Sequence, residues 1–335
     1  MSKLFAQTIR PLARLEVYEL ASLFMLSVLF VVFISFPARL HRVLGTGGSR
    51  HPLLDNALSL VDRPDFWLYG TLSVLIGLIA WFTRRKTDTH AVQLHRFARV
   101  ALTFIAVLIV FDVINFYTVV FDPYDHDRLL QHLDDVLFRT SPTRWFDAVT
   151  CWPLTLLFCG AYSSWFVMTY FSVFLFSRHS HLAMREYVTA AVCAFYIGYI
   201  TYFFVPAIGP IFTMHFTHSI GPLENLVDGN GPFLSRDCFP SLHTGLSVVM
   251  LIHAWRYCRK LFWFYALDVS LIILSTLYLR VHYGVDLIAG AALAIAVCQV
   301  APAFVSGWDH TRGSYENDAI YRHSATSQST LSELA

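Results

Sequence analysis

Residues 280–304 read RVHYGVDLIAGAALAIAVCQVAPAF, a polar segment that runs directly into a long apolar one. The apolar part, from Leu287 to Phe304, contains no charged side chain. A run of about 18 apolar residues is long enough to cross the hydrocarbon core of a bilayer as a helix. The stretch therefore predicts a membrane-spanning helix that begins beside an Arg, a His and an Asp.

Similar apolar runs recur along the chain of 335 residues, of which 56% are hydrophobic and only 14% are charged. Because an ordinary soluble domain has about 25% charged residues, this composition excludes a soluble enzyme, a disordered protein and a disulfide scaffold. The net charge of +1 argues against nucleic acid as a partner, since that needs a concentrated basic face. We expect an all-α fold, a polytopic membrane helix bundle with about eight transmembrane helices. The predicted spans are residues 18–37, 66–83, 97–121, 148–177, 187–206, 242–258, 261–281 and 284–304.

Lys and Arg are distributed unevenly over the predicted loops, and cytoplasmic loops are usually richer in them. An N-terminus on the inside places most of these cations in the cytoplasm, with the C-terminus there as well. The polar residues 306–335 are then predicted to be a flexible cytoplasmic tail. We expect a multi-pass membrane protein, and favour a bacterial inner or plasma membrane over a membrane of the secretory pathway.

An amphipathic stretch lies between the third and fourth predicted spans. Its apolar residues recur at helical spacing, with Asp127 and other polar residues on the opposite face. The apolar stripe consists of Leu129, Leu130, Leu133, Val136 and Leu137. Such a helix either lies flat at the outer membrane interface or forms a lid over a site that faces lipid.

Residues 238–243 read CFPSLH and lead into the sixth predicted span. Pro240 disfavours helical geometry in the residue before it, which makes Ser241 a natural N-cap. A capped helix start presents free backbone N–H groups and the positive end of the helix dipole, and both suit an anion such as phosphate. His243 falls in the first turn of that helix. The alternative is that Pro-Ser only starts the helix and that the histidine is incidental.

His282 and Asp286 are four residues apart, so in a helix they share one face. An Asp that holds one imidazole nitrogen orients the other and makes it more basic, as in catalytic dyads. A salt-bridged pair at a helix start is the simpler alternative. Because two spans separate His243 from His282, the chain returns to the same membrane face and the two motifs are expected to meet. Two His and one Asp can bind a metal, but the N-cap and the lack of further carboxylates favour phosphate.

The six cysteines are scattered along the chain and form no Cys-x-x-Cys pair. Most of them fall within predicted spans. We expect them to be small apolar packing residues.

Together these motifs resemble those of the type 2 phosphatidic acid phosphatase superfamily. Pro240-Ser241-Leu242-His243 looks like its second motif, and Ser275 through His282-Tyr283 to Asp286 looks like its third. The Phe-Pro-Ser-Leu-His form and the Leu-Ile-Ala-Gly after Asp286 are most similar to the inositol phosphorylceramide synthase-like, or inositolphosphotransferase-like, branch. Residues 127–138 and 202–210 are similar to that branch as well. The resemblance covers roughly residues 120–305.

The resemblance implies a six-helix phosphatase-type core in the C-terminal two-thirds of the chain. Residues 1–120 would then be N-terminal transmembrane helices, residues 121–305 the catalytic membrane domain and residues 306–335 the tail. It further implies that His282 attacks phosphorus, that Asp286 orients it, and that His243 protonates the leaving oxygen. Ser241 and backbone amides would hold the phosphoryl oxygens. Neither a metal nor another cofactor is implied.

Two departures from the family pattern concern the cations that clamp phosphate. The Lys-six-Arg-Pro motif of the hydrolases has no match on the predicted outer face; Arg178 and Arg185 have the spacing but read as positive-inside charges. Thr276 occupies the position of a second family arginine. The nearest cations, Arg280 and Arg236, are therefore the candidate phosphate-binding residues, and the losses favour the transferase-like branch.

The sequence thus predicts a phosphotransferase or phosphatase for a membrane lipid or polyprenyl phosphate, acting at the non-cytoplasmic face. A lipid or headgroup transporter that uses the polar cluster for binding is one alternative, and a non-catalytic scaffold of the same fold is another. The sequence leaves the oligomeric state open.

Overall fold

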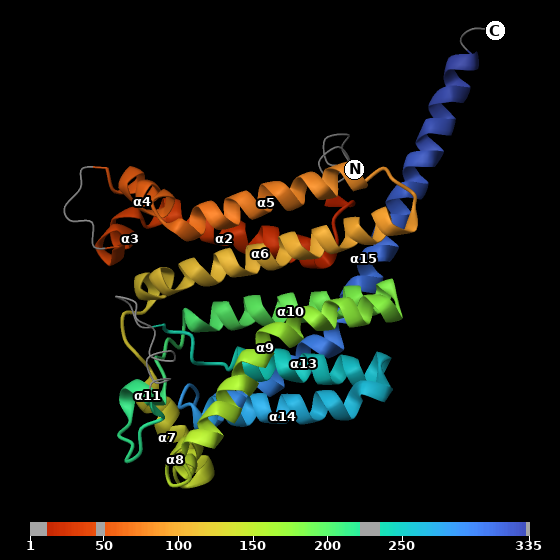
Figure 1. Cartoon of the computed structure of the whole chain (residues 1–335). Coiled ribbons are helices and arrows are strands. Elements are labelled where there is room, and N and C mark those ends of the chain that lie inside the picture. Colours follow the sequence, from red (N-terminus) through yellow and green to blue (C-terminus); the bar gives the residue numbers. More distant parts are fainter. Residues whose placement is uncertain (1–11, 45–50, 222–234, 333–335) are drawn as a thin grey trace.

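The computed structural model of the protein describes residues 12–44, 51–221 and 235–332, and it is all-helical over these ranges, with no strand among them. Eight long helices form the bundle in Figure 1. They are α2 (Val17–Ser35), α5 (Pro64–Thr83), α6 (Thr89–Phe121), α9 (Trp152–His179), α10 (His181–Tyr202), α13 (Leu242–Tyr257), α14 (Phe262–Tyr278) and α15 (Gly284–Ser332). The short helices are α3 (Pro37–Leu44), α4 (Pro52–Val61), α7 (Asp127–Phe138), α8 (Pro142–Asp147), α11 (Pro210–Thr213) and the 3-10 helix η2 (Arg259–Leu261).

Each of the eight predicted spans corresponds to one of the long helices, which confirms the polytopic all-α fold. Among the described residues, six helices are long and apolar enough to cross a membrane: α2, α5, α6, α9, α14 and α15. The other two, α10 and α13, lie inside the bundle, where α13 is only 16 residues long and α10 carries Arg185 and Glu186.

Polar N-caps start two of the helices earlier than the apolar pattern predicted. The Asp88 side chain accepts a hydrogen bond from the Ala91 amide at the start of α6, and the Ser180 hydroxyl accepts one from Ala183 at the start of α10. A cap satisfies backbone N–H groups that the helix itself leaves free. The helices therefore begin at the cap rather than at the first apolar residue.

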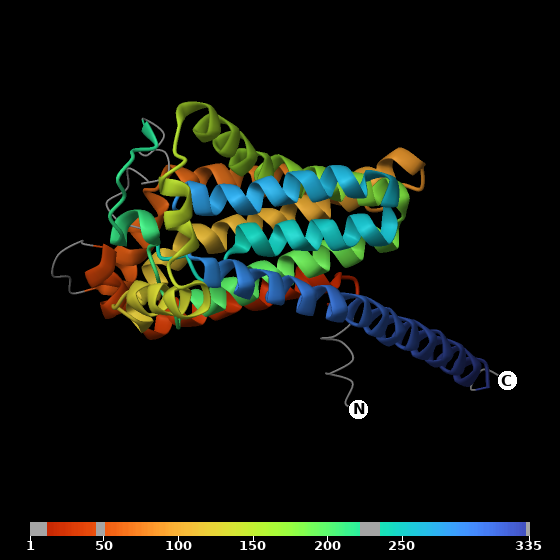
Figure 2. The ribbon, with the colours of Figure 1, turned by 90° about the horizontal axis from the view of Figure 1, so that it is seen from below.

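Helix α10 is the centre of the packing. It contacts α2, α6, α9, α13 and α15, and most of its side chains are buried. Several of these are alanines with no exposed surface, and small residues allow neighbouring helices to approach closely. By contrast, α5 lies on the outer side of the N-terminal layer formed with α2 and α6 (Figures 1 and 2), and its Trp67, Val74 and Phe82 are more than half exposed. This is the pattern expected of a helix that faces lipid.

Helix α15 continues to Ser332 and projects from the bundle (Figure 1). Residues 306–332 of the predicted flexible cytoplasmic tail are helical, and residues 333–335 lie outside the described ranges. Residues 306–332 contain no proline, and a helix once nucleated gains one hydrogen bond per added residue. The beginning of this extension is fixed by Arg185, which lies 2.7 Å from both Glu16 and Asp309. Arg185 is thus buried in an ion-pair network at the membrane end remote from α7, not in a loop.

The two faces of α7 agree only in part with the predicted stripes, because Leu130 is buried in the protein while Arg128 and Asp135 are exposed. Leu129, Val136 and Leu137 are exposed, whereas Asp127 and Asp134 are buried. The predicted polar face was therefore wrong for Asp127. An apolar face that points away from the protein agrees with a helix lying at the membrane interface, where lipid takes the place of the core.

Asp134 is buried because it caps the start of α15. Its carboxylate accepts hydrogen bonds from the Gly284 amide at 3.0 Å, the Val285 amide at 2.8 Å and the Ser141 hydroxyl at 2.7 Å. Gly284 is required at this contact, since a Cβ there would lie 2.7 Å from the Pro142 ring. An acidic group at a helix N-terminus also interacts favourably with the helix dipole. Helix α7 is thereby fixed to the segment that carries the third sequence motif.

Asp134→Ala tests this cap. The substitution leaves two buried backbone amides and one hydroxyl without their acceptor, and we expect a loss of about 2 kcal/mol of stability. The melting temperature of the purified protein in detergent should fall by several degrees. The matched control is Asp135→Ala, because Asp135 is the exposed neighbour on the same helix. Equal melting temperatures for the two variants would contradict the capping role.

Candidate functional site

The two sequence motifs meet where the first turn of α13 crosses the first turns of α15. Ser241 is the N-cap of α13, as predicted, and its hydroxyl accepts a hydrogen bond from the Thr244 amide at 3.2 Å. Its own amide donates to the Asp286 carbonyl at 3.1 Å. The crossing is so close that a Cβ on Gly290 would lie 2.2 Å from the Ser241 carbonyl oxygen. Glycine at this position therefore sets the distance between the two motifs.

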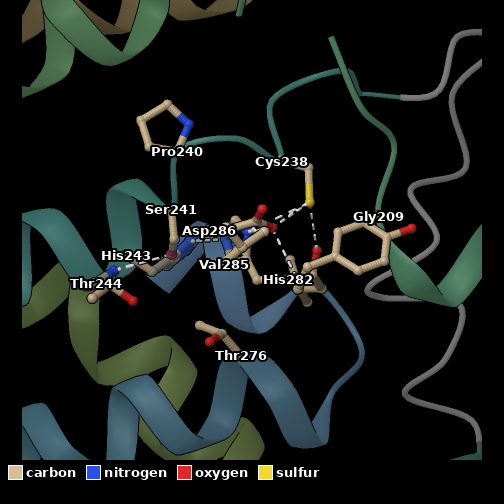
Figure 3. Close-up of polar contacts among 12 residues, drawn as sticks. Gly209, Cys238, Pro240, Ser241, His243, Thr244, Thr276, His282, Val285 and Asp286 are labelled. Carbon is tan, nitrogen blue, oxygen red and sulfur yellow. Dashed lines mark hydrogen bonds and ion pairs between the residues drawn. The ribbon is translucent and has the colours of Figure 1, made fainter. Parts of the chain in front are cut away.

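His282 lies between Asp286 and His243, as Figure 3 shows. Its Nδ1 is 3.4 Å from Asp286 Oδ2, and its Nε2 is 3.4 Å from His243 Nδ1. The same Asp286 oxygen accepts the Tyr283 amide at 2.8 Å. His282 and Asp286 are almost completely buried. The structure thus brings together His243, His282 and Asp286, which the sequence singled out as catalytic.

This order of groups determines what His282 can do. A carboxylate beside Nδ1 favours the tautomer that carries its proton there, and the Nε2 lone pair is then available. That nitrogen faces the second histidine, which can exchange a proton with a group bound beside the pair. The arrangement is that of a nucleophile, its orienting carboxylate and a neighbouring acid or base.

His243 occupies an aromatic pocket on α9. Its ring centroid is 4.5 Å from that of Tyr162 and 4.6 Å from that of Trp165. The buried Nε2 atom has no hydrogen-bond partner among the described residues. The pocket holds the ring in place by packing, which leaves its nitrogens for polar contacts with His282 and with a substrate.

Cys238 is part of the same cluster, and the prediction that it is a packing residue was incomplete. Its Sγ lies 3.0 Å from Asp286 Oδ2 and 3.6 Å from His282 Nδ1 (Figure 3). Burial and nearby carboxylates raise the pKa of Cys238 well above its usual value, so the thiol keeps its proton at neutral pH. The residue stands three positions before Ser241, and this proximity was the available signal in the sequence.

Asp127 supports the site from α7, a role that the sequence did not indicate. Its carboxylate accepts hydrogen bonds from the Ile208 and Gly209 amides at 3.0 and 2.8 Å, and from the Tyr283 hydroxyl at 3.0 Å. Gly209 has a φ of 99°, and a Cβ there would lie 2.7 Å from the Val281 carbonyl oxygen. The loop before α11 is therefore packed directly against the backbone that leads into His282.

Arg280 is buried next to the site and already has partners. One Nη atom lies 3.2 Å from Asp147 Oδ1 and also donates to the His218 carbonyl, and the guanidinium lies 4.1 Å from the centroid of the Phe216 ring. Although burial alone would raise the pKa of Asp147, amide hydrogen bonds and Arg280 lower it below its ordinary value. Arg280 is thus a buried cation that is directed at Asp147.

Arg236 contacts the segment after α6. Its Nε lies 3.0 Å from Asp125 Oδ1, and its Nη atoms donate to the carbonyls of Asp122 and Pro123. No contact among the described residues joins Arg236 or Arg280 to the histidine pair. Thr276 occupies the position of the family arginine. Its hydroxyl donates a hydrogen bond to a backbone carbonyl of its own helix. The phosphate-binding role of the two arginines stays a prediction.

Comparison with known proteins points to the same part of the chain. The family model of the PAP2 superfamily matches residues 135–300, which include both histidine motifs and helices α8 to α14. Searches of curated proteins and of solved structures found no match. The resemblance at the superfamily level is therefore supported, whereas the inositolphosphotransferase-like branch has no support beyond the motifs. The C-terminal part of this all-helical membrane protein carries a domain of the PAP2 superfamily.

Proposed function

We propose that the protein is an integral-membrane phosphatase or phosphotransferase that acts on a lipid-linked phosphoester through a phosphohistidine. The observation that carries the proposal is the contact series Asp286, His282, His243, in which each neighbouring pair of polar atoms is 3.4 Å apart. It places a carboxylate on one side of the central imidazole and a second imidazole on the other.

In the first step, His282 Nε2 attacks phosphorus and the bond from phosphorus to the leaving oxygen breaks. Asp286 stabilises the positive charge that develops on the ring, and His243 gives a proton to the leaving oxygen. In the second step, His243 takes a proton from water or from an alcohol, whose oxygen then replaces His282 on phosphorus. Water completes a hydrolase cycle, and an alcohol completes a transferase cycle. We favour the transferase cycle over the hydrolase cycle because Thr276 occupies a position at which the hydrolases of the family have an arginine.

Phosphate binding in this proposal uses the start of α13. The Ser241 hydroxyl accepts from the Thr244 amide and so keeps its hydrogen for a phosphoryl oxygen. The Leu242 and His243 amides lie at the same helix start, where the positive end of the helix dipole favours an anion. Arg280 supplies positive charge if it turns from Asp147 toward the substrate. Arg236 is the second candidate, from the loop that leads to Cys238.

The lipid character of the substrate is supported by an apolar groove of about 540 Å³ between α5, α6 and α9. Phe104 and Tyr170 line it. The Phe195 ring packs between Phe104 in the groove and Trp165, which contacts His243. The rings of Phe195 and Trp165 therefore connect the lining of the groove to His243.

The proposed position at the non-cytoplasmic face rests on charge. Helix α13 runs from the site to the turn that contains Arg259 and Lys260, so the site and this basic turn are at opposite ends of the bundle. Cytoplasmic loops carry the excess of Lys and Arg. The end formed by α7, α8 and α11 is then the outer one.

The function is tested by incubating the purified protein with a panel of labelled lipid phosphates and phospholipids. Free phosphate and new phospholipids are measured together. We expect turnover of at least one substrate and its loss in His282→Ala. Full turnover by His282→Ala would contradict the proposal, and so would substrate movement across a proteoliposome membrane without any product.

His243→Ala separates the acid from the nucleophile. For an alkyl phosphoester we expect a loss of roughly 100- to 10,000-fold in kcat, the usual contribution of general acid catalysis. An aryl phosphoester whose leaving group needs no proton should lose much less. Equal losses for both esters would show that His243 does not act as the acid.

Arg280→Gln tests the phosphate clamp, with Asp147→Asn as its matched control. Both variants break the same ion pair, so both should lower the melting temperature similarly. Only Arg280→Gln removes the cation, and a charge-assisted hydrogen bond is worth about 2 kcal/mol, which corresponds to a rise in KM of roughly 30-fold. Equal KM changes in the two variants would make the role of Arg280 structural.

A further inference from the structure

Three ligand atoms of different chemistry converge beside His282, on the side away from His243. Cys238 Sγ, His282 Nδ1 and Asp286 Oδ2 all lie within 4.8 Å of one another, and all three residues are buried. Soft thiolate, imidazole and carboxylate together are the donor set of zinc sites in proteins. No lipid or phosphate chemistry requires the thiol.

The separations of these atoms fit one tetrahedral ion. Tetrahedral Zn²⁺, with bonds of about 2.3 Å to sulfur and about 2.1 Å to nitrogen and oxygen, holds S and N about 3.6 Å apart and N and O about 3.4 Å apart. The observed separations are 3.6 Å for Sγ to Nδ1 and 3.4 Å for Nδ1 to Oδ2. Only the Sγ to Oδ2 pair, at 3.0 Å, must widen, by about 0.6 Å, once a metal replaces the thiol proton between them.

The surroundings of the three atoms also favour a cation. Asp286 Oδ1 is buried and accepts no hydrogen bond from the described residues. Asp127 and Asp237 add negative potential at the Cys238 sulfur. The two nearby arginines are directed at Asp147 and Asp125 rather than at this cluster. A bound divalent ion would balance this excess of negative charge.

We propose that Cys238, His282 and Asp286 form a binding site for a thiophilic divalent metal such as Zn²⁺, and that the metal switches the enzyme off. Binding releases the thiol proton to solvent and moves the Nδ1 proton of His282 to Nε2, because a neutral imidazole that ligates through one nitrogen carries its proton on the other. The Nε2 lone pair is then no longer available for attack on phosphorus. The inhibitory part rests on the proposed phosphohistidine function, whereas metal binding does not.

The test uses Co²⁺ as a spectroscopic probe of the full-length protein in detergent. We expect one Co²⁺ per chain, with a thiolate-to-cobalt charge-transfer band and the visible bands of tetrahedral cobalt, all displaced by Zn²⁺. Cys238→Ser should lose the charge-transfer band. The matched control is Cys298→Ser, because Cys298 is also buried with its sulfur 3.9 Å from a histidine, His253, but has no carboxylate in that contact. The control should keep the whole spectrum.

Turnover is measured on the same samples. Saturating Zn²⁺ should lower phosphoester turnover by roughly 100-fold, in line with loss of the nucleophile, and a chelator should restore it. Absence of the charge-transfer band in the unsubstituted protein, or its persistence in Cys238→Ser, would overturn the metal site. A bound metal that leaves turnover unchanged would overturn the inhibition. Failure to find any turnover bears on the proposed function alone, because the cobalt spectrum does not depend on activity.

Discussion

The capping of α15 by α7 is the interaction on which the site depends. Helix α15 begins with two amides that bond to Asp134, a residue 150 positions earlier in the chain. Asp127 on the same helix fixes the loop before α11 and the Tyr283 side chain. Because His282 lies immediately before Tyr283, these two carboxylates together determine where the proposed nucleophile stands. Helix α7, a short helix at the membrane interface, thus positions the proposed nucleophile His282 in the third motif.

The positions of the eight long helices and the meeting of the two histidine motifs could be predicted because both follow from local rules, although only six of these helices are long and apolar enough to cross a membrane. Apolar run length gives the spans, and two crossings between His243 and His282 return the chain to one membrane face. Ser241 was identified as a cap from the residues beside it. The roles of Asp127 and Asp134 could not be found in this way, since all their partners except Ser141 are 81 to 156 residues away.

The burial of Asp127 was missed for a different physical reason. An acidic side chain in an amphipathic helix is usually assigned to the face that contacts water. At a membrane interface lipid lies outside, and Leu129 and Val136 can face it while acidic residues turn inward to backbone amides. Cys238 was misjudged because a cysteine in an apolar context normally packs, whereas here its sulfur lies beside the carboxylate that orients the proposed nucleophile. The extension of α15 was missed because a polar sequence does not by itself end a helix.

The proposed active site would bind an anionic substrate although several carboxylates lie around it. Asp286, Asp127 and Asp134 are each held by several N–H or O–H donors, so much of their charge is already compensated within the fold. The helix start at Ser241 and the cations Arg280 and Arg236 remain to bind phosphate. Asp286 Oδ1 is the exception, because it accepts no hydrogen bond from the described residues, and the proposed metal would bind on that side of His282.

The central claim is that the phosphoryl group passes through His282. The most direct measurement is to mix the protein with an isotopically labelled lipid phosphoester, quench it in base within one turnover, and locate the label by mass spectrometry of the digested protein. The account predicts a labelled phosphate on His282, bound through Nε2. A label on His243, Cys238 or Asp286, or steady turnover with no label on the protein, would contradict it.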